Sequence, residues 1–172
     1  MTGAEEDVDD SDPPEAEGRP RVRGTLSRLV KKGKKEIPVS EDPDTLLWQV
    51  QQFTDRVVKK HGTDSLQAAR ARMELSLQLG TMGRWEEARQ LREESFASFS
   101  HHAGEQDAET LHTELSLAIA QAHTDRWTEA EAHLRHAAAT SLEALGPDHE
   151  VTALAQRRLD EFAGGGRGPA SA

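Results

Sequence analysis

The feature that most constrains the fold of this chain is an internal repeat, in which similar segments recur at one constant spacing. Gly62, Gly104 and Gly146 are spaced by 42. At the same shift, the segment GRWEEA at 83–88 aligns with DRWTEA at 125–130. Several independent matches at one shift are not accidental, and a period of this size indicates stacked copies of one supersecondary unit.

Each unit is predicted to form two helices joined by a tight turn. We expect the first helices over 64–81 and 106–123, and the second over 85–101 and 127–143. The turn residue is Gly83 in one unit and Asp125 in the other. Asp is one of the few residues other than Gly that tolerate turn conformations.

The start of each second helix carries one large and one small residue at fixed positions. Trp85 and Trp127 open these helices, where each can wedge into the crevice between the paired helices. Ala88 and Ala130 follow one turn later, where a close approach of two helices requires a small side chain.

Helices are also predicted on both sides of the repeats. Asp42-Pro43 is typical of an N-cap and a first helical residue, and Asp148 is expected to cap a closing helix that covers the last apolar face. Because no alternating strand pattern occurs, we predict an all-α domain over 41–163. It comprises about five helices, with a lead helix 43–60, a repeat 61–102, a repeat 103–144 and a closing helix 147–163.

The repeat resembles the tetratricopeptide repeat family, in its 42-residue, kinesin-light-chain-like form common in bacteria. The resemblance rests on the two segments at 83–88 and 125–130 and on LGPDHEVT at 145–152, and it covers roughly 61–163. It implies a short α-α superhelical solenoid that acts as a protein-binding scaffold. Arg92 departs from the family, which has an apolar or aromatic residue there, whereas the matching Leu134 fits.

The same resemblance implies that the first helices of the repeats line a concave groove. The groove positions are Arg70, Met73, Leu77, Thr81, His112, Leu115, Ile119 and His123. The residues themselves leave two interpretations open. Their apolar stripes are either ordinary core or the floor of a groove that holds a short peptide or one helix of a partner.

The charge of the chain is distributed in blocks. The sequence carries 31 Asp+Glu and 21 Lys+Arg, a net charge of −10. Residues 1–18 hold eight acids and no base, and residues 19–35 hold eight bases and no acid, so residues 36–172 account for the whole −10. We expect 1–18 to be a disordered acidic arm and 164–172 a flexible Gly-rich tail.

The basic arm and linker, 19–40, is the second candidate for binding. Its bases are Arg19, Arg21, Arg23, Arg28, Lys31, Lys32, Lys34 and Lys35. Three interpretations stay open: the arm neutralises the acidic parts of the chain, docks on a partner protein, or contacts nucleic acid or an anionic membrane surface. The absence of aromatic residues in 19–35 weakens the case for single-stranded nucleic acid.

Composition and motifs argue against several classes of function. There is no Cys, no apolar run long enough to span a bilayer and no secretion-signal pattern, so we expect a cytoplasmic protein. No nucleophile elbow, Walker loop, dinucleotide glycine pattern or HExxH motif occurs. His101-His102 and His133-x-x-His136 are interpreted as surface histidines rather than metal ligands, because a tight site needs three or four supported ligands.

The sequence therefore predicts a non-enzymatic adaptor without cofactor or metal, which binds another protein in the groove of its repeats. The alternative is a regulator whose basic arm contacts nucleic acid or membrane. Self-association through the apolar faces is a third possibility.

Overall fold

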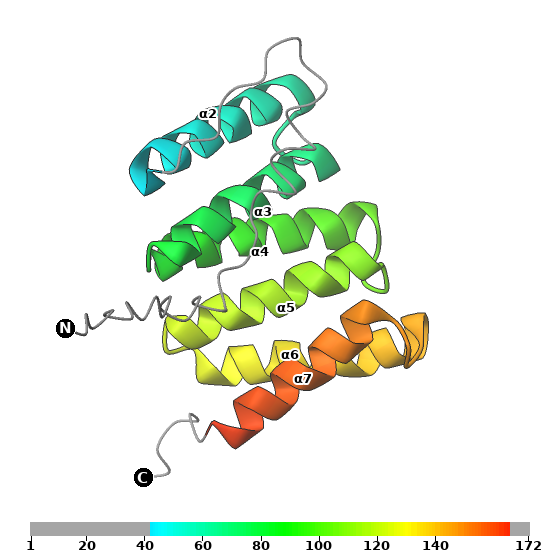
Figure 1. Cartoon of the computed structure of the whole chain (residues 1–172). Coiled ribbons are helices and arrows are strands. Elements are labelled where there is room, and N and C mark those ends of the chain that lie inside the picture. Colours follow the sequence, from blue (N-terminus) through cyan, green and yellow to red (C-terminus); the bar gives the residue numbers. More distant parts are fainter. Residues whose placement is uncertain (1–41, 166–172) are drawn as a thin grey trace, which may run out of the picture. The chain divides into compact units, whose positions relative to one another are not determined.

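The structure, a computed structural model, describes residues 42–165, and these form six helices without a strand (Figure 1). The helices are α2 (Pro43–His61), α3 (Leu66–Thr81), α4 (Trp85–His102), α5 (Ala108–His123), α6 (Trp127–Leu145) and α7 (Glu150–Gly164). The all-α prediction is confirmed, but the predicted count of about five helices is wrong by one. Two repeats of two helices already give four, to which the lead and closing helices are added.

The ends of the helices follow from local capping. The Asp42 carboxylate accepts the Thr45 backbone N–H at 2.8 Å, and Pro43 is the first helical residue of α2, as predicted. At α7 the predicted cap was wrong. His149 rather than Asp148 is the N-cap, and its Nδ1 accepts the Val151 N–H at 3.2 Å.

The backbone repeats at the same spacing as the sequence. Gly83 has φ 74° in the turn between α3 and α4, and Asp125 has φ 59° in the turn between α5 and α6. Asp125 is the one non-Gly residue with positive φ among the described residues, which agrees with the prediction that it replaces a turn glycine. In both turns the next helix begins two positions later, at Trp85 and at Trp127.

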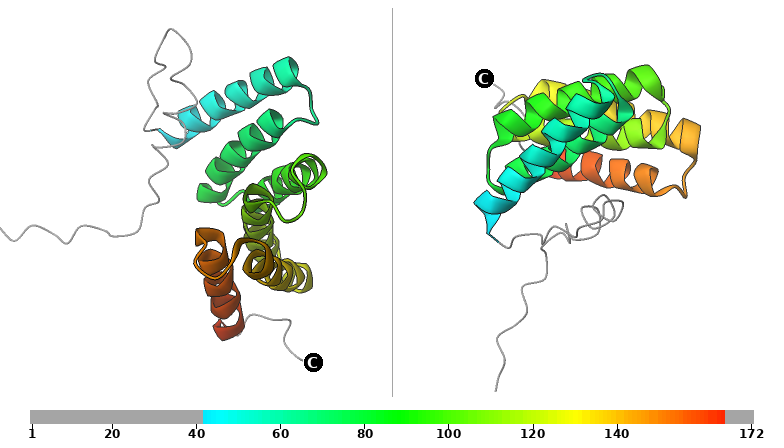
Figure 2. Two further views of the ribbon diagram at one scale, coloured as in Figure 1. Left: turned by 90° about the vertical axis from the view of Figure 1, so that its right-hand side faces the viewer. Right: turned by 90° about the horizontal axis from the view of Figure 1, so that it is seen from above.

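Each helix packs on the next one along the chain, and α5 also contacts α7 (Figures 1 and 2). An ion pair between Arg70 and Glu109, with N and O 2.6 Å apart, joins α3 to α5. The first helices of the repeats therefore lie beside one another. Ala88 and Ala130 are fully buried in the second helices, as their small size predicted.

Arg92 lies in the core, although the sequence suggested an apolar residue there. The residue is 4% exposed, its Nε donates to Ser76 Oγ at 3.1 Å, and its Nη1 donates to the Ser116 carbonyl at 2.7 Å. Burial lowers the pKa of the Arg92 guanidinium to about 10. Arg92 therefore ties α3, α4 and α5 together while remaining charged at neutral pH.

Replacing Arg92 tests this role. Arg92→Ala is expected to lower the free energy of unfolding by about 3 kcal/mol, because it removes both hydrogen bonds and leaves a cavity. Arg92→Leu, which copies Leu134 of the second repeat, is expected to lower it by less than about 1 kcal/mol. Ser76 Oγ keeps its bond to the Met73 carbonyl in either variant.

Urea unfolding followed by circular dichroism measures both changes. Equal losses of stability for the two variants would show that the packing volume at this position does not matter, contrary to this account.

Candidate functional site

The predicted groove residues lie on α3 and α5, at positions related by the repeat spacing. Arg70, Thr81, His112 and His123 are exposed, and Leu77 is 41% exposed. Met73 and Ile119 are half-buried, which makes them accessible from one side.

Leu115 is a correction to the predicted groove. It is only 1% exposed and belongs to a core cluster with Leu111 from its own helix and Leu134 from α6. The cluster also contains Val151 and Ala155 from α7, so Leu115 is packed among α5, α6 and α7 and supports the fold.

The closing helix α7 extends the same surface, although none of its residues is among the predicted groove positions. The repeat spacing relates Leu77 to Ile119 and then to Glu161, and relates Thr81 to His123 and then to Gly165. Applying the same shift once more to the predicted groove positions would have found these residues. We call the surface formed by the outer sides of α3, α5 and α7 the first-helix face.

A cavity of about 660 Å³ opens where α5, α6 and α7 meet at the end of this face. Its lining includes Ile119 and His123 from α5, Trp127 from α6, and Phe162 and Gly165 from the end of the chain. The ring centroids of Trp127 and Phe162 are 6.0 Å apart at an angle of 43°. The cavity therefore combines an aromatic wall with two residues of the predicted groove.

Charged groups surround the aromatic wall of the cavity. Asp125, Arg158 and Glu161 contribute to the lining. Arg158 Nη1 donates to Glu161 Oε2 at 2.8 Å, whereas Arg158 Nε is buried without a hydrogen-bond partner among the described residues. Apolar walls with a few polar groups at fixed places are typical of sites that bind one side chain or a small ligand.

His133 and His136 on α6 share one buried carboxylate. Glu114 on α5 is 2% exposed, and its Oε1 lies 2.9 Å from the Nδ1 atoms of both histidines. With a proton on Nδ1, each imidazole donates to this carboxylate. The two histidines, whose i, i+3 spacing invites a metal interpretation, thus contact a buried carboxylate and join α6 to α5.

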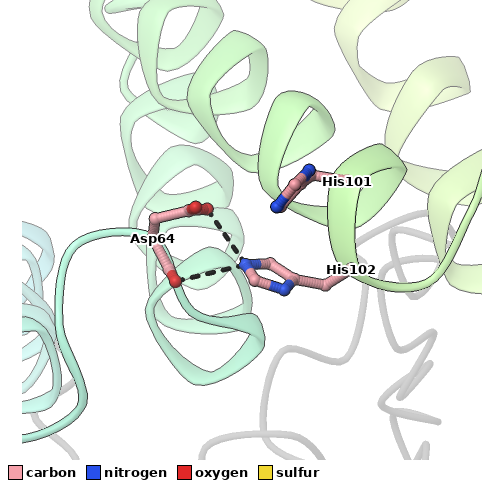
Figure 3. A group of neighbouring side chains, drawn as sticks. All are labelled: Asp64, His101 and His102. Atoms are coloured by element: carbon pink, nitrogen blue, oxygen red, sulfur yellow. Dashed lines mark hydrogen bonds and ion pairs between the residues drawn. The ribbon is translucent and has the colours of Figure 1, made fainter.

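Asp64, His101 and His102 form a second histidine cluster (Figure 3). One potential ligand atom from each of the three exposed residues lies within 4.8 Å of the others, so their chemistry would suit a divalent ion such as Zn²⁺. His102 Nε2 lies 3.2 Å from both Asp64 Oδ1 and the Asp64 carbonyl, an arrangement that links the end of α4 to the turn before α3. Asp64 was not predicted as a neighbour of the two histidines, because no helical spacing relates it to them.

The basic arm, with its eight bases between 19 and 35, and the acidic arm lie outside the described residues. The described part, 42–165, carries 21 acidic and 12 basic side chains, a net charge of −9. No helix in this part is both long enough and apolar enough to span a bilayer.

Comparison of the chain with models of known protein families gives no match, and comparison with curated proteins gives none either.

The titration of His112 gives a test of the electrostatics on this face. Although part of the His112 side chain is exposed, desolvation by the groups packed around it lowers the pKa of its imidazole below the ordinary 6.5, while Glu150 and Glu109 act in the opposite direction. The unfolded chain then binds more protons near pH 6, so the stability contributed by neutral His112 is present above pH 6.5 and is lost as the pH falls.

Nuclear magnetic resonance (NMR) titration of the histidine Cε1 protons, with His112→Gln to assign the signal, measures this pKa. A titration midpoint at or above 6.5 would contradict the described environment. The variant is also expected to lose less stability than the wild type between pH 7 and 5.

Proposed function

We propose that this protein is a non-enzymatic adaptor of the tetratricopeptide-like helical-repeat type, which binds a peptide or a helix of a partner protein on its first-helix face. The observation that carries the proposal is the aromatic cavity between α5, α6 and α7. Its lining includes Ile119 and His123, two of the residues that the family resemblance implies for the groove.

The arrangement of the helices supports this class of protein. Helix pairs that recur at a constant spacing, with a tryptophan opening each second helix, are what the sequence resemblance implies for the fold. Repeat folds of this kind present extended surfaces made from equivalent positions of successive units. In this chain those positions are on α3, α5 and α7.

The surface chemistry suits recognition of an extended segment or a helix. Leu77 and Ile119 offer apolar contact at equivalent positions, and the Arg70–Glu109 ion pair lies on the same face. A cavity of about 660 Å³ is large enough for one or two anchoring side chains. Because packed helices hold the surface in place, binding would order few groups on the side of the adaptor.

Affinity capture with the full chain tests the proposal, using a lysate of the source organism and quantitative mass spectrometry. Leu77→Glu and Ile119→Glu each place a charge on the first-helix face and are expected to reduce the specific partner at least about tenfold. Leu142→Glu is the matched control, because Leu142 is an apolar residue of α6 with 54% exposure and does not line the aromatic cavity.

Circular dichroism first establishes that all three variants are folded. The proposal is contradicted when folded Leu77→Glu and Ile119→Glu proteins retain every partner, or when Leu142→Glu loses the partner equally. Loss that follows only deletion of 19–35 would favour the basic-arm alternative instead.

A further inference from the structure

The two tryptophans that open the second helices have different surroundings. Trp85 is covered: the imidazole of His123 from the next repeat stacks on its ring with centroids 3.7 Å apart and planes within 6°. The guanidinium carbon of Arg92 lies 5.9 Å from the centre of the same ring. Trp85 thus has two planar, nitrogen-containing groups beside its indole.

Trp127 has different neighbours: the apolar ring of Phe162 lies 6.0 Å from its indole, and Arg158 shares the cavity lining with it. The repeat spacing puts Gly165 in the place of His123 and Leu134 in the place of Arg92. Neither replacement can stack a planar polar group on the indole. The cavity of about 660 Å³ opens at this place, and both Gly165 and Leu134 line it.

We propose that the cavity beside Trp127 binds the guanidinium group of an arginine side chain supplied by a partner protein. This inference rests on the proposed function and names the chemistry of the anchoring side chain. The arginine would take the place at Trp127 that the His123 ring occupies at Trp85.

Charge and shape both favour a planar cation. A guanidinium stacks on an indole face and is attracted by the ring quadrupole, whereas an ammonium cannot stack. Asp125 lies in the lining and forms no ion pair within 42–165, so its carboxylate is available to a bound cation. The cation already present, Arg158, is paired with Glu161 through Nη1 at 2.8 Å, and its Nε is buried without a hydrogen-bond partner among the described residues.

The charge of the whole described part points the same way. Its net charge of −9 attracts a basic partner segment and disfavours an acidic one. A neutral aromatic side chain would fill the volume but would gain no attraction from Asp125.

The test uses the indole N–H signals of Trp48, Trp85 and Trp127 in ¹H–¹⁵N NMR spectra of the full chain. The probe is N-acetyl-arginine methylamide, and N-acetyl-leucine methylamide is the matched neutral compound. Trp48, which is 63% exposed, reports unspecific contact between the probe and any indole. The arginine probe is expected to shift Trp127 saturably, with about tenfold higher affinity than at Trp48, and to leave Trp85 unchanged.

Two reciprocal substitutions make the test specific. Gly165→His restores the missing ring and is expected to abolish binding at Trp127. Gly165 has φ −75°, which side chains adopt readily, and its added Cβ would lie 3.1 Å from the Glu161 carbonyl, so this carbonyl must move by a few tenths of an ångström. His123→Ala uncovers the other indole, so the probe is expected to shift Trp85 in this variant.

Arg167 follows closely after Gly165 in the sequence, and it supplies a control for an occupant from this chain. If Arg167→Ala shifts the Trp127 signal in the absence of any probe, the Arg167 side chain of this chain already occupies the cavity. The partner proposal is then overturned. It is also overturned when Trp127 responds no more than Trp48, or equally to the leucine probe.

Failure of this inference can be told apart from failure of the adaptor proposal. In one case Ile119→Glu loses the partners, Gly165→His keeps them, and the Trp127 signal does not respond to the arginine probe. The adaptor proposal then holds, but the arginine site is wrong. Probe binding at Trp127 with all partners retained by Ile119→Glu would leave an arginine site without the proposed adaptor function.

Discussion

The structure depends on the contact between the tryptophan that opens a second helix and the helices on either side of it. At Trp85 the contact is close, because a Cβ on Gly80 would lie 3.1 Å from the indole ring. His123 then stacks on this ring and so connects one repeat to the next. Ala88, one turn into α4, is fully buried and lets the helices approach. These contacts fix the register of the stack.

The sequence predicted most of this fold because the repeat period, turn residues and caps act locally. Most helix ends lie within two residues of the predicted ones, but the closing helix begins at Glu150 instead of 147, and Asp125 lies in a turn as predicted. Long-range packing was harder to predict. Leu115 belongs to a core cluster with residues of α6 and α7, and a helical stripe alone does not show which side is covered. Arg92 is buried because Ser76 and Ser116 satisfy it, and neither is near it in sequence.

The sequence predicted only part of the candidate site, because long-range packing decides which side chains meet there. The resemblance placed Ile119 and His123 on the surface that carries the cavity, but it stopped at the second repeat and left out α7. Trp127 was recognised as a structural wedge only. Its surroundings differ from those of Trp85: His123 stacks on Trp85, whereas Gly165 stands at the equivalent position beside Trp127 and offers no ring, and the ring near Trp127 is that of Phe162, 6.0 Å away. The difference between the two tryptophans thus comes from the end of the repeat array, where one side chain is missing.

Hydrogen–deuterium exchange of the full chain, measured with and without its captured partner, tests most directly whether the first-helix face is the binding surface. The account predicts that slowed exchange will concentrate at the end of α5, the turn at 124–126 and the last turn of α7. Slowed exchange confined to α4 and the outer side of α6, or to residues 19–35, would contradict it.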